Sequence, residues 1–183
     1  MNAPNILTSF RILLVPVLMA FLLLRFPGHN LAALGVFLLA MLTDAVDGIL
    51  ARWTNTVTEL GKLLDPIADK LLLTAAFVCL VETGAVPAWI AVIIIGRELA
   101  VTGFRAIAAA KEIVIAASAA GKIKVWLESA AIVLLLLNPE WLGRFTAAPR
   151  VFLGLALTAA VLSGLEVFFK YGPRLVRAEP SRG

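Results

Sequence analysis

The sequence predicts an all-α, polytopic membrane protein with six transmembrane helices and both termini in the cytosol. Hydrophobic residues make up 61% of its 183 residues, and the mean hydropathy is +0.98, whereas soluble domains are about half apolar. The apolar residues gather in runs of about 20, the length at which a helix crosses a bilayer. These runs cover residues 5–24, 31–53, 61–82, 87–110, 119–137 and 150–170.

Short connections rich in Gly, Pro and Asn separate most of these runs and set the predicted helix ends. The first run is expected to be a retained helix, because Arg25-Phe26-Pro27 follows it in place of a signal-peptide cleavage site. Ser118 is placed to cap the N-terminus of the fifth helix. The connections are residues 27–30, 54–60, 82–86, 111–118 and 138–149.

The distribution of basic residues predicts the orientation. Six spans put both termini on one side of the membrane, and the positive-inside rule assigns that side to the cytosol. In this orientation most Lys and Arg residues are cytosolic, and only Arg25, Arg144 and Arg150 lie outside. The net charge of +4 does not indicate nucleic-acid binding, since the basic residues lie at the ends of apolar runs.

We expect one membrane domain over residues 1–171 and a cytosolic tail over 172–183. The tail is rich in Pro, Arg and Gly, a composition typical of disorder. Cys79 is the single cysteine and excludes an internal disulfide. The single histidine, His29, argues against a histidine-based metal site or a Ser/His triad.

Four carboxylates stand within the second and third runs, in the pattern D-x-x-D-G-x-x-A-R, eight residues, then G-x-x-x-D-x-x-x-D. Helical spacing puts each half of the pattern on one face of its helix. The predicted orientation places both halves at a similar depth, on the cytosolic side of the membrane centre. The pattern positions are Asp44, Asp47, Gly48, Ala51, Arg52, Gly61, Asp65 and Asp69.

These acids predict a site for divalent cations. A charge inside hydrocarbon costs about 2.5–3.5 kcal/mol on insertion scales, and like charges that share a site need a counter-charge. Metal ions held by carboxylates in a membrane indicate phosphate chemistry on a lipid. The small residues of the pattern leave room for a ligand.

Other interpretations stay open at this point. Lys70 or Arg52 could neutralise a purely structural pair of acids. Acids also line cation pathways in transporters, but these would spread across the membrane depth, whereas the four aspartates lie on one side. The remaining intramembrane acids are Glu98, next to Arg97, and Glu128.

The pattern resembles the signature of the CDP-alcohol phosphotransferases, and every signature position is filled. Other segments are similar to one branch of that family, the phosphatidylglycerophosphate synthases. Two positions depart from that branch, which commonly has Thr and Gln where this chain has Val125 and Glu128. The similar segments are Asn5 to Arg11, Leu64 to Lys70, Arg97 to Arg105 and Ile115 to Lys124.

The resemblance implies transfer of a phosphatidyl group from CDP-diacylglycerol to glycerol 3-phosphate, with release of CMP. It implies two divalent metal ions, Mg²⁺ or Mn²⁺, held by Asp44, Asp47 and Asp65. Asp69 completes the metal-binding carboxylate set and is also expected to be the general base. A direct displacement is expected, because no Ser, Cys or His stands at a signature position.

The remaining candidate residues divide between the two substrates. Snorkelling to headgroups would equally explain Arg11 and Arg105, and Lys122 and Lys124 can be topology charges. Expected to contact the donor nucleotide are Asn5, Thr8, Gly48, Ala51, Arg52 and Gly61. Expected to bind the acceptor phosphate are Arg105, Lys122, Lys124 and Arg97.

We expect a homodimer in the inner (plasma) membrane of a bacterium, surrounded by membrane lipid, with the active site facing the cytosol and no nucleic-acid partner. The same chemistry with inositol phosphate, serine or phosphatidylglycerol as acceptor is the first alternative. A cation-coupled transporter and a non-catalytic scaffold are alternatives of other classes.

Overall fold

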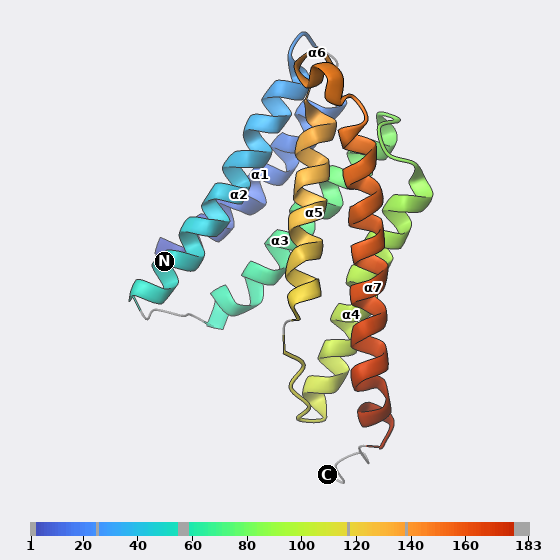
Figure 1. Ribbon diagram of the computed structural model, residues 1–183. Helices are drawn as coiled ribbons and strands as arrows, with labels where there is room; N and C mark the ends of the chain where they lie inside the picture. The colour runs from blue at the N-terminus through green and yellow to red at the C-terminus, as the bar shows by residue number, and fades with distance from the viewer. Residues whose placement is uncertain (1–2, 25, 55–58, 117, 138, 178–183) are drawn as a thin grey trace. The chain divides into compact units, whose positions relative to one another are not determined.

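A computed structural model describes residues 3–24, 26–54, 59–116, 118–137 and 139–177 (Figure 1). Side chains are described for residues 7–24, 26–46, 67–116, 118–137 and 141–175. The described ranges are helical and contain no strand. The elements are α1 (Ala3–Leu23), α2 (His29–Thr54), α3 (Glu59–Glu82), α4 (Ala88–Ala110), α5 (Ala119–Leu136), α6 (Pro139–Leu142), the 3-10 helix η1 (Gly143–Phe145) and α7 (Ala148–Arg177).

The all-α prediction is confirmed for the described residues, and six long helices stand where the six apolar runs were predicted. Two segments, His29–Val46 and Ala148–Leu175, are long and apolar enough to cross a membrane by length and composition. Leu7–Leu23 forms a shorter apolar helix. The six-span topology and the cytosolic termini stay predictions.

The prediction of a disordered tail from residue 172 is wrong over its first half. Helix α7 continues to Arg177 and contains Pro173. The last four carbonyl oxygens of a helix have no hydrogen-bond partner within that helix. Lys111 donates a 3.1 Å hydrogen bond to one of them, the carbonyl oxygen of Leu175. Arg174 lies over the ring of Tyr171, and cations in the last turns favour the helix dipole.

The connection before the sixth long helix contains structure that the sequence did not predict. The short helix α6 and η1 occupy most of it. Gly143 has a φ of +49°, in the left-handed region that glycine adopts without strain. The predicted cap is confirmed, because the Ser118 hydroxyl accepts a 3.1 Å hydrogen bond from the amide of Gly121 in the first turn of α5.

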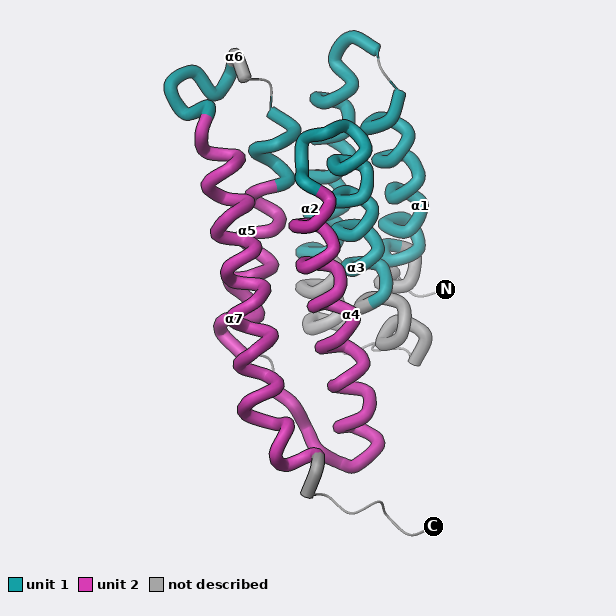
Figure 2. Tube along the Cα trace, turned by 90° about the vertical axis from the view of Figure 1, so that its right-hand side faces the viewer, with its two compact units in different colours: residues 1–87, 132–146 teal, residues 88–131, 147–183 magenta. Residues whose placement is uncertain are grey.

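The chain divides into two compact units (Figure 2). Unit 1 contains residues 1–87 and 132–146, and unit 2 contains residues 88–131 and 147–183. In unit 1, α1 packs against both α2 and α3, while the described parts of α2 and α3 make few contacts with each other. Leu18 of α1 and Phe37 of α2 are completely buried there.

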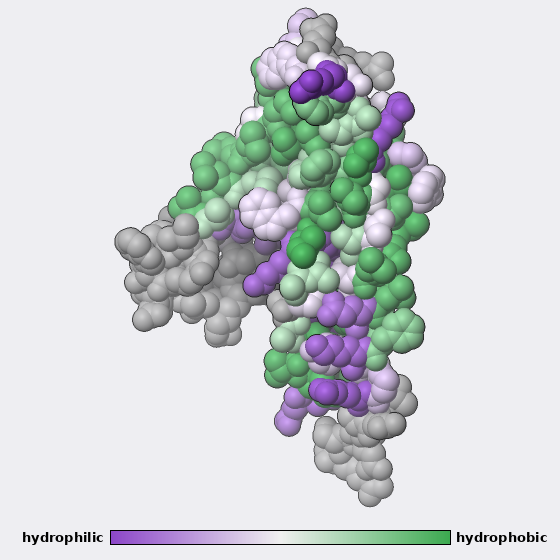
Figure 3. Space-filling view, viewed as in Figure 1, coloured by the Kyte–Doolittle hydropathy of each residue, from purple (hydrophilic) through white to green (hydrophobic). Residues whose placement is uncertain are grey.

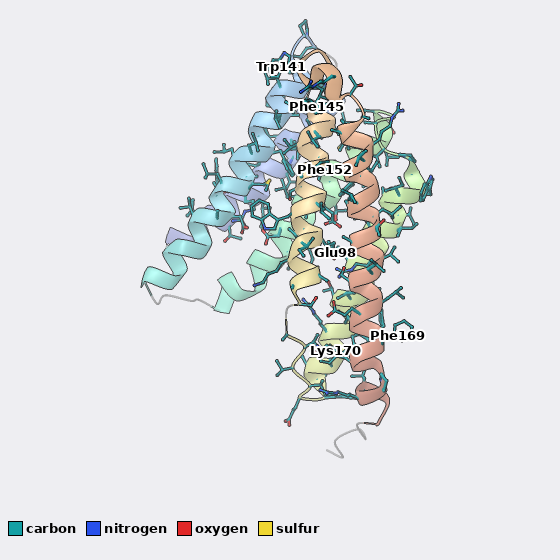
Figure 4. All side chains as sticks on the ribbon, in the orientation of Figure 1. Glu98, Trp141, Phe145, Phe152, Phe169 and Lys170 are labelled. Atoms are coloured by element: carbon teal, nitrogen blue, oxygen red, sulfur yellow. The ribbon has the colours of Figure 1, made fainter. Side chains whose placement is uncertain are left out.

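In unit 2, α4 packs against α7. Phe104 and Phe168 meet edge to face, with ring centroids 4.9 Å apart. Many large apolar side chains of this unit point outward; Phe169, for example, projects from α7 (Figure 4). Hydrophobic side chains cover much of the surface in view, and hydrophilic ones gather near the C-terminal end of α7 (Figure 3).

Candidate active site

Two of the four signature aspartates have described side chains, and both belong to unit 1. Asp44 lies on α2 and Asp69 on α3, and each carboxylate is about half exposed, at 51% and 48%. The Oδ1 atoms of both form ion pairs with the same nitrogen, Nη1 of Arg11, at 3.0 Å for Asp44 and 2.9 Å for Asp69, and Nη1 donates a hydrogen bond to Asp69. The helices therefore bring the two carboxylates to one cation, as the predicted convergence of the two faces requires.

Arg11 is the site residue that sequence reasoning missed. Snorkelling would leave its side chain in the headgroups, but the side chain is only 1% exposed. It belongs to one buried stripe of α1, formed by Thr8, Arg11, Val15, Leu18 and Leu22. This spacing of three and four residues is the signal in the sequence that predicts its burial.

The other signature side chains lie outside the described part of the structure, although the helical backbone of α2 and α3 carries them. Thr8 is described and is buried. The predicted residues whose side chains are not described are Asn5, Asp47, Gly48, Ala51, Arg52, Gly61 and Asp65.

The described carboxylates fit a divalent cation. Their oxygens already converge on a positive charge, and hard cations such as Mg²⁺ take oxygen ligands. Among the described residues there is no group of three or more metal-ligating side chains. A complete ligand set thus depends on Asp47 and Asp65, and the metal site stays a prediction.

Unit 2 contains a pocket of about 360 Å³ between α4 and α5. All four cations that were predicted to bind the acceptor phosphate line it, so the structure brings together residues from two separate runs. The pocket is lined by Arg97, Glu98, Arg105, Ser118, Gly121, Lys122, Lys124, Val125 and Trp126.

An ion-pair network forms part of the wall of this pocket. Lys124 Nζ lies 2.5 Å from Glu98 Oε1 and 3.1 Å from Glu128 Oε2. Glu98, labelled in Figure 4, also pairs with Arg97. Lys124 and Glu128 are each only 1% exposed, so each depends on the other to offset the cost of burying a charge.

Arg97 is held on three sides. Besides the pair with Glu98, its Nη2 donates to the Ser163 hydroxyl at 2.8 Å and its Nε donates to the Ala160 carbonyl at 3.2 Å. A Cβ atom at Gly164 would lie 3.0 Å from Arg97 Cγ. The small residues of α7 thus let the guanidinium pack against the helix.

Arg105 and Lys122 differ from the other two cations. Both are exposed, and neither forms an ion pair with any residue that the structure describes. Within the network, the charges of Glu98 and Glu128 balance those of Arg97 and Lys124. The uncompensated positive charge of the pocket therefore comes from Arg105 and Lys122.

Known proteins resemble the chain over most of its length. The family model for CDP-alcohol phosphatidyltransferase matches residues 1–165. The CDP-diacylglycerol–glycerol-3-phosphate 3-phosphatidyltransferase of Bacillus subtilis (strain 168) is 42% identical over 183 residues, covering 92% of this chain and 94% of the relative.

Two further relatives agree. A probable phosphatidylglycerophosphate synthase of Mycobacterium tuberculosis (strain H37Rv) is 39% identical, over 90% of this chain and 79% of the relative. The CDP-diacylglycerol–glycerol-3-phosphate 3-phosphatidyltransferase of Rickettsia felis is 34% identical, over 91% and 93%. With the signature aspartates of α2 and α3 present, the chain belongs to the CDP-alcohol phosphatidyltransferase family and is an enzyme of that family.

Proposed function

We propose that the enzyme transfers a phosphatidyl group from CDP-diacylglycerol to glycerol 3-phosphate in a metal-dependent reaction that releases CMP. The names of its relatives support these substrates. The observation that carries the acceptor assignment is the pocket of unit 2, where Arg105 and Lys122 leave an uncompensated positive charge. A phosphate monoester dianion matches that charge better than neutral acceptors do.

Asp44, Asp47 and Asp65 hold two Mg²⁺ or Mn²⁺ ions in this proposal. When bound, these ions neutralise the donor pyrophosphate and polarise the phosphorus under attack. Asp69 accepts the proton of the acceptor hydroxyl as that oxygen attacks the β-phosphorus of the donor, and CMP leaves. The contact of Asp69 with Arg11 supports the convergence of the carboxylates that this chemistry needs.

The two groups of cations have different tasks in the acceptor pocket. Arg105 and Lys122, which are exposed, contact the phosphate directly, and the guanidinium of Arg105 can do so through two hydrogen bonds. Arg97 and Lys124 complete the wall of the pocket. Their pairing with acids keeps them in place before the acceptor arrives.

The donor nucleotide is assigned to the signature region of unit 1. Gly48, Ala51 and Gly61 provide the space, and Arg52 contacts the pyrophosphate. Asn5 and Thr8 of α1 contribute polar contacts. Thr8 shares its buried stripe with Arg11, which supports a place for this part of α1 beside the carboxylates.

We further propose that the long helices α1 to α5 and α7 cross the inner membrane of a bacterium, with both termini and the active site on the cytosolic side. The outward-facing apolar side chains would then contact lipid. The functional unit in this proposal is a homodimer.

The decisive experiment is acceptor-dependent CMP release by purified protein in mixed micelles with CDP-diacylglycerol and Mg²⁺. Glycerol 3-phosphate, inositol phosphate, serine and phosphatidylglycerol are compared. Release with glycerol 3-phosphate alone, lost on chelation, supports the proposed reaction, its metal dependence and the acceptor assignment. Release with another acceptor retains the catalytic centre and refutes the acceptor assignment. No release with any acceptor, from folded protein that binds metal, refutes the proposed reaction.

A further inference from the structure

We propose that Arg11 is a positioning residue: it supplies the counter-charge that holds the signature carboxylates together until metal ions replace it. The inference rests on the proposed metal site, but it concerns the metal-free protein. Arg11 would thus organise the two halves of the signature without contacting substrate.

The geometry carries the first step. Oδ1 of Asp44 and Oδ1 of Asp69 both approach Nη1 of Arg11, at 3.0 and 2.9 Å. These acids come from different helices, and the described parts of α2 and α3 contact each other little. Helix α1 packs against both, so Arg11 connects the two halves through the element that lies against each of them.

Charge gives the second step. Carboxylates that share a site repel each other unless a positive charge stands between them. A buried guanidinium likewise needs acidic partners, because an uncompensated buried charge is strongly destabilising. The side chain of Arg11 is only 1% exposed. It therefore depends on its acidic partners much more than an arginine that reaches the headgroups would. The pairing therefore favours the folded, metal-free arrangement.

Competition gives the third step. A metal ion that binds Asp44 or Asp69 needs carboxylate oxygens that Arg11 contacts, and it also meets the repulsion of the guanidinium. Metal binding must then weaken or displace these ion pairs. Removing the charge of Arg11 should destabilise the metal-free protein and make metal binding tighter, two effects of opposite sign that a purely structural arginine would not produce together.

The test uses the full-length protein in detergent, with Mn²⁺ as the probe. Unfolding temperature without metal and the Mn²⁺ dissociation constant are measured for the natural protein, Arg11→Met and Arg11→Lys. The control is Arg150→Met, an exposed arginine of α7. Turnover is not needed for either readout.

For Arg11→Met we expect the metal-free unfolding temperature to fall by a few degrees, because Asp44 and Asp69 then repel each other without a counter-charge and are themselves about half exposed. Saturating Mn²⁺ should recover most of the loss, and its dissociation constant should fall about tenfold, a change that is modest beside the interaction of two close charges. Both values for Arg11→Lys should lie between those of the natural protein and Arg11→Met, since an ammonium keeps the charge but lacks the planar fork of a guanidinium. Arg150→Met should match the natural protein.

An unchanged metal-free unfolding temperature, or weaker Mn²⁺ binding by Arg11→Met, would overturn the inference. If Arg11→Met does not fold without metal, Arg11→Lys decides by the same two measurements. Failure of the natural protein to bind Mn²⁺ would overturn the replacement step and the proposed metal site together. Lack of turnover in protein that binds Mn²⁺ would refute only the proposed function.

Discussion

The buried pair of Lys124 and Glu128 offers the sharpest test of the network in the wall of the pocket. The perturbation is Lys124→Met, which keeps an unbranched side chain one atom shorter and removes its charge. Glu128 would then be buried at 1% exposure without the ammonium that lies 3.1 Å from its Oε2. Its other oxygen, Oε1, has no hydrogen-bond partner among the described residues, so that carboxylate has no second interaction to rely on there.

The expected loss of stability follows from the burial of both Lys124 and Glu128. Removing one member of a buried ion pair costs about 3–5 kcal/mol, because it leaves an uncompensated charge. Each kcal/mol corresponds to about 2–4 °C in a chain of this size. We therefore expect the unfolding temperature of Lys124→Met to fall by about 6–20 °C, measured by thermal unfolding of the detergent-solubilised protein.

A double variant separates the pair from general damage to packing. Lys124→Met with Glu128→Leu removes both charges, and replacing a whole buried pair with apolar residues is often neutral. Glu98 keeps its pairing with Arg97. The double variant should therefore be more stable than Lys124→Met alone, a strongly non-additive result in a double-mutant cycle.

Lys122→Met is the matched control. It makes the same substitution on the same helix, at an exposed position without an ion pair to any described residue, and should change stability by no more than about 0.5 kcal/mol. If Lys124→Met behaves like this control, or if the two changes at Lys124 and Glu128 are additive, the network does not contribute as argued.

Four further variants test the site and the helix that packs against it. Asp69→Asn should abolish CMP release while Mn²⁺ binding, measured by calorimetry, largely survives; a comparable loss of Mn²⁺ affinity would assign this residue to the ligands rather than to the base. Lys122→Ala should raise the apparent KM for the acceptor more than that for the donor, and equal effects would remove it from the acceptor pocket. Gly164→Ala should destabilise the protein by about 1 kcal/mol, because the clash with the firmly held Arg97 outweighs the gain in helix propensity. Gly154→Ala is the control on the same helix, because an added Cβ there would have nothing within 4 Å. It should stabilise the protein by about 0.5–1 kcal/mol, and chemical denaturation measures both changes. A gain in stability at both positions would show that the guanidinium of Arg97 moves aside.

The helical class and the limits of the long helices, apart from the end of the last one, could be predicted from the sequence. Each element is a run of apolar residues bounded by turn-forming residues, and these are local signals that need no knowledge of packing. The cap at Ser118 was predictable for the same reason. The helical part of the tail could not be predicted in this way. There α7 reaches Arg177, and its end is bonded by Lys111, a residue distant in the chain.

In the candidate site, too, local signals in the sequence predicted some features, and contacts between distant residues set the others. Its acids and cations were recognisable from residue type and spacing, because phosphate chemistry needs those groups in any fold of this kind. Which charges compensate each other became visible only in the packed helices. Arg11 turns out to be buried between Asp44 and Asp69, and Lys124 lies between two glutamates while Lys122 remains exposed. Such pairings depend on distances between helices that are remote in sequence, and the free energy of a buried charge is set by those distances.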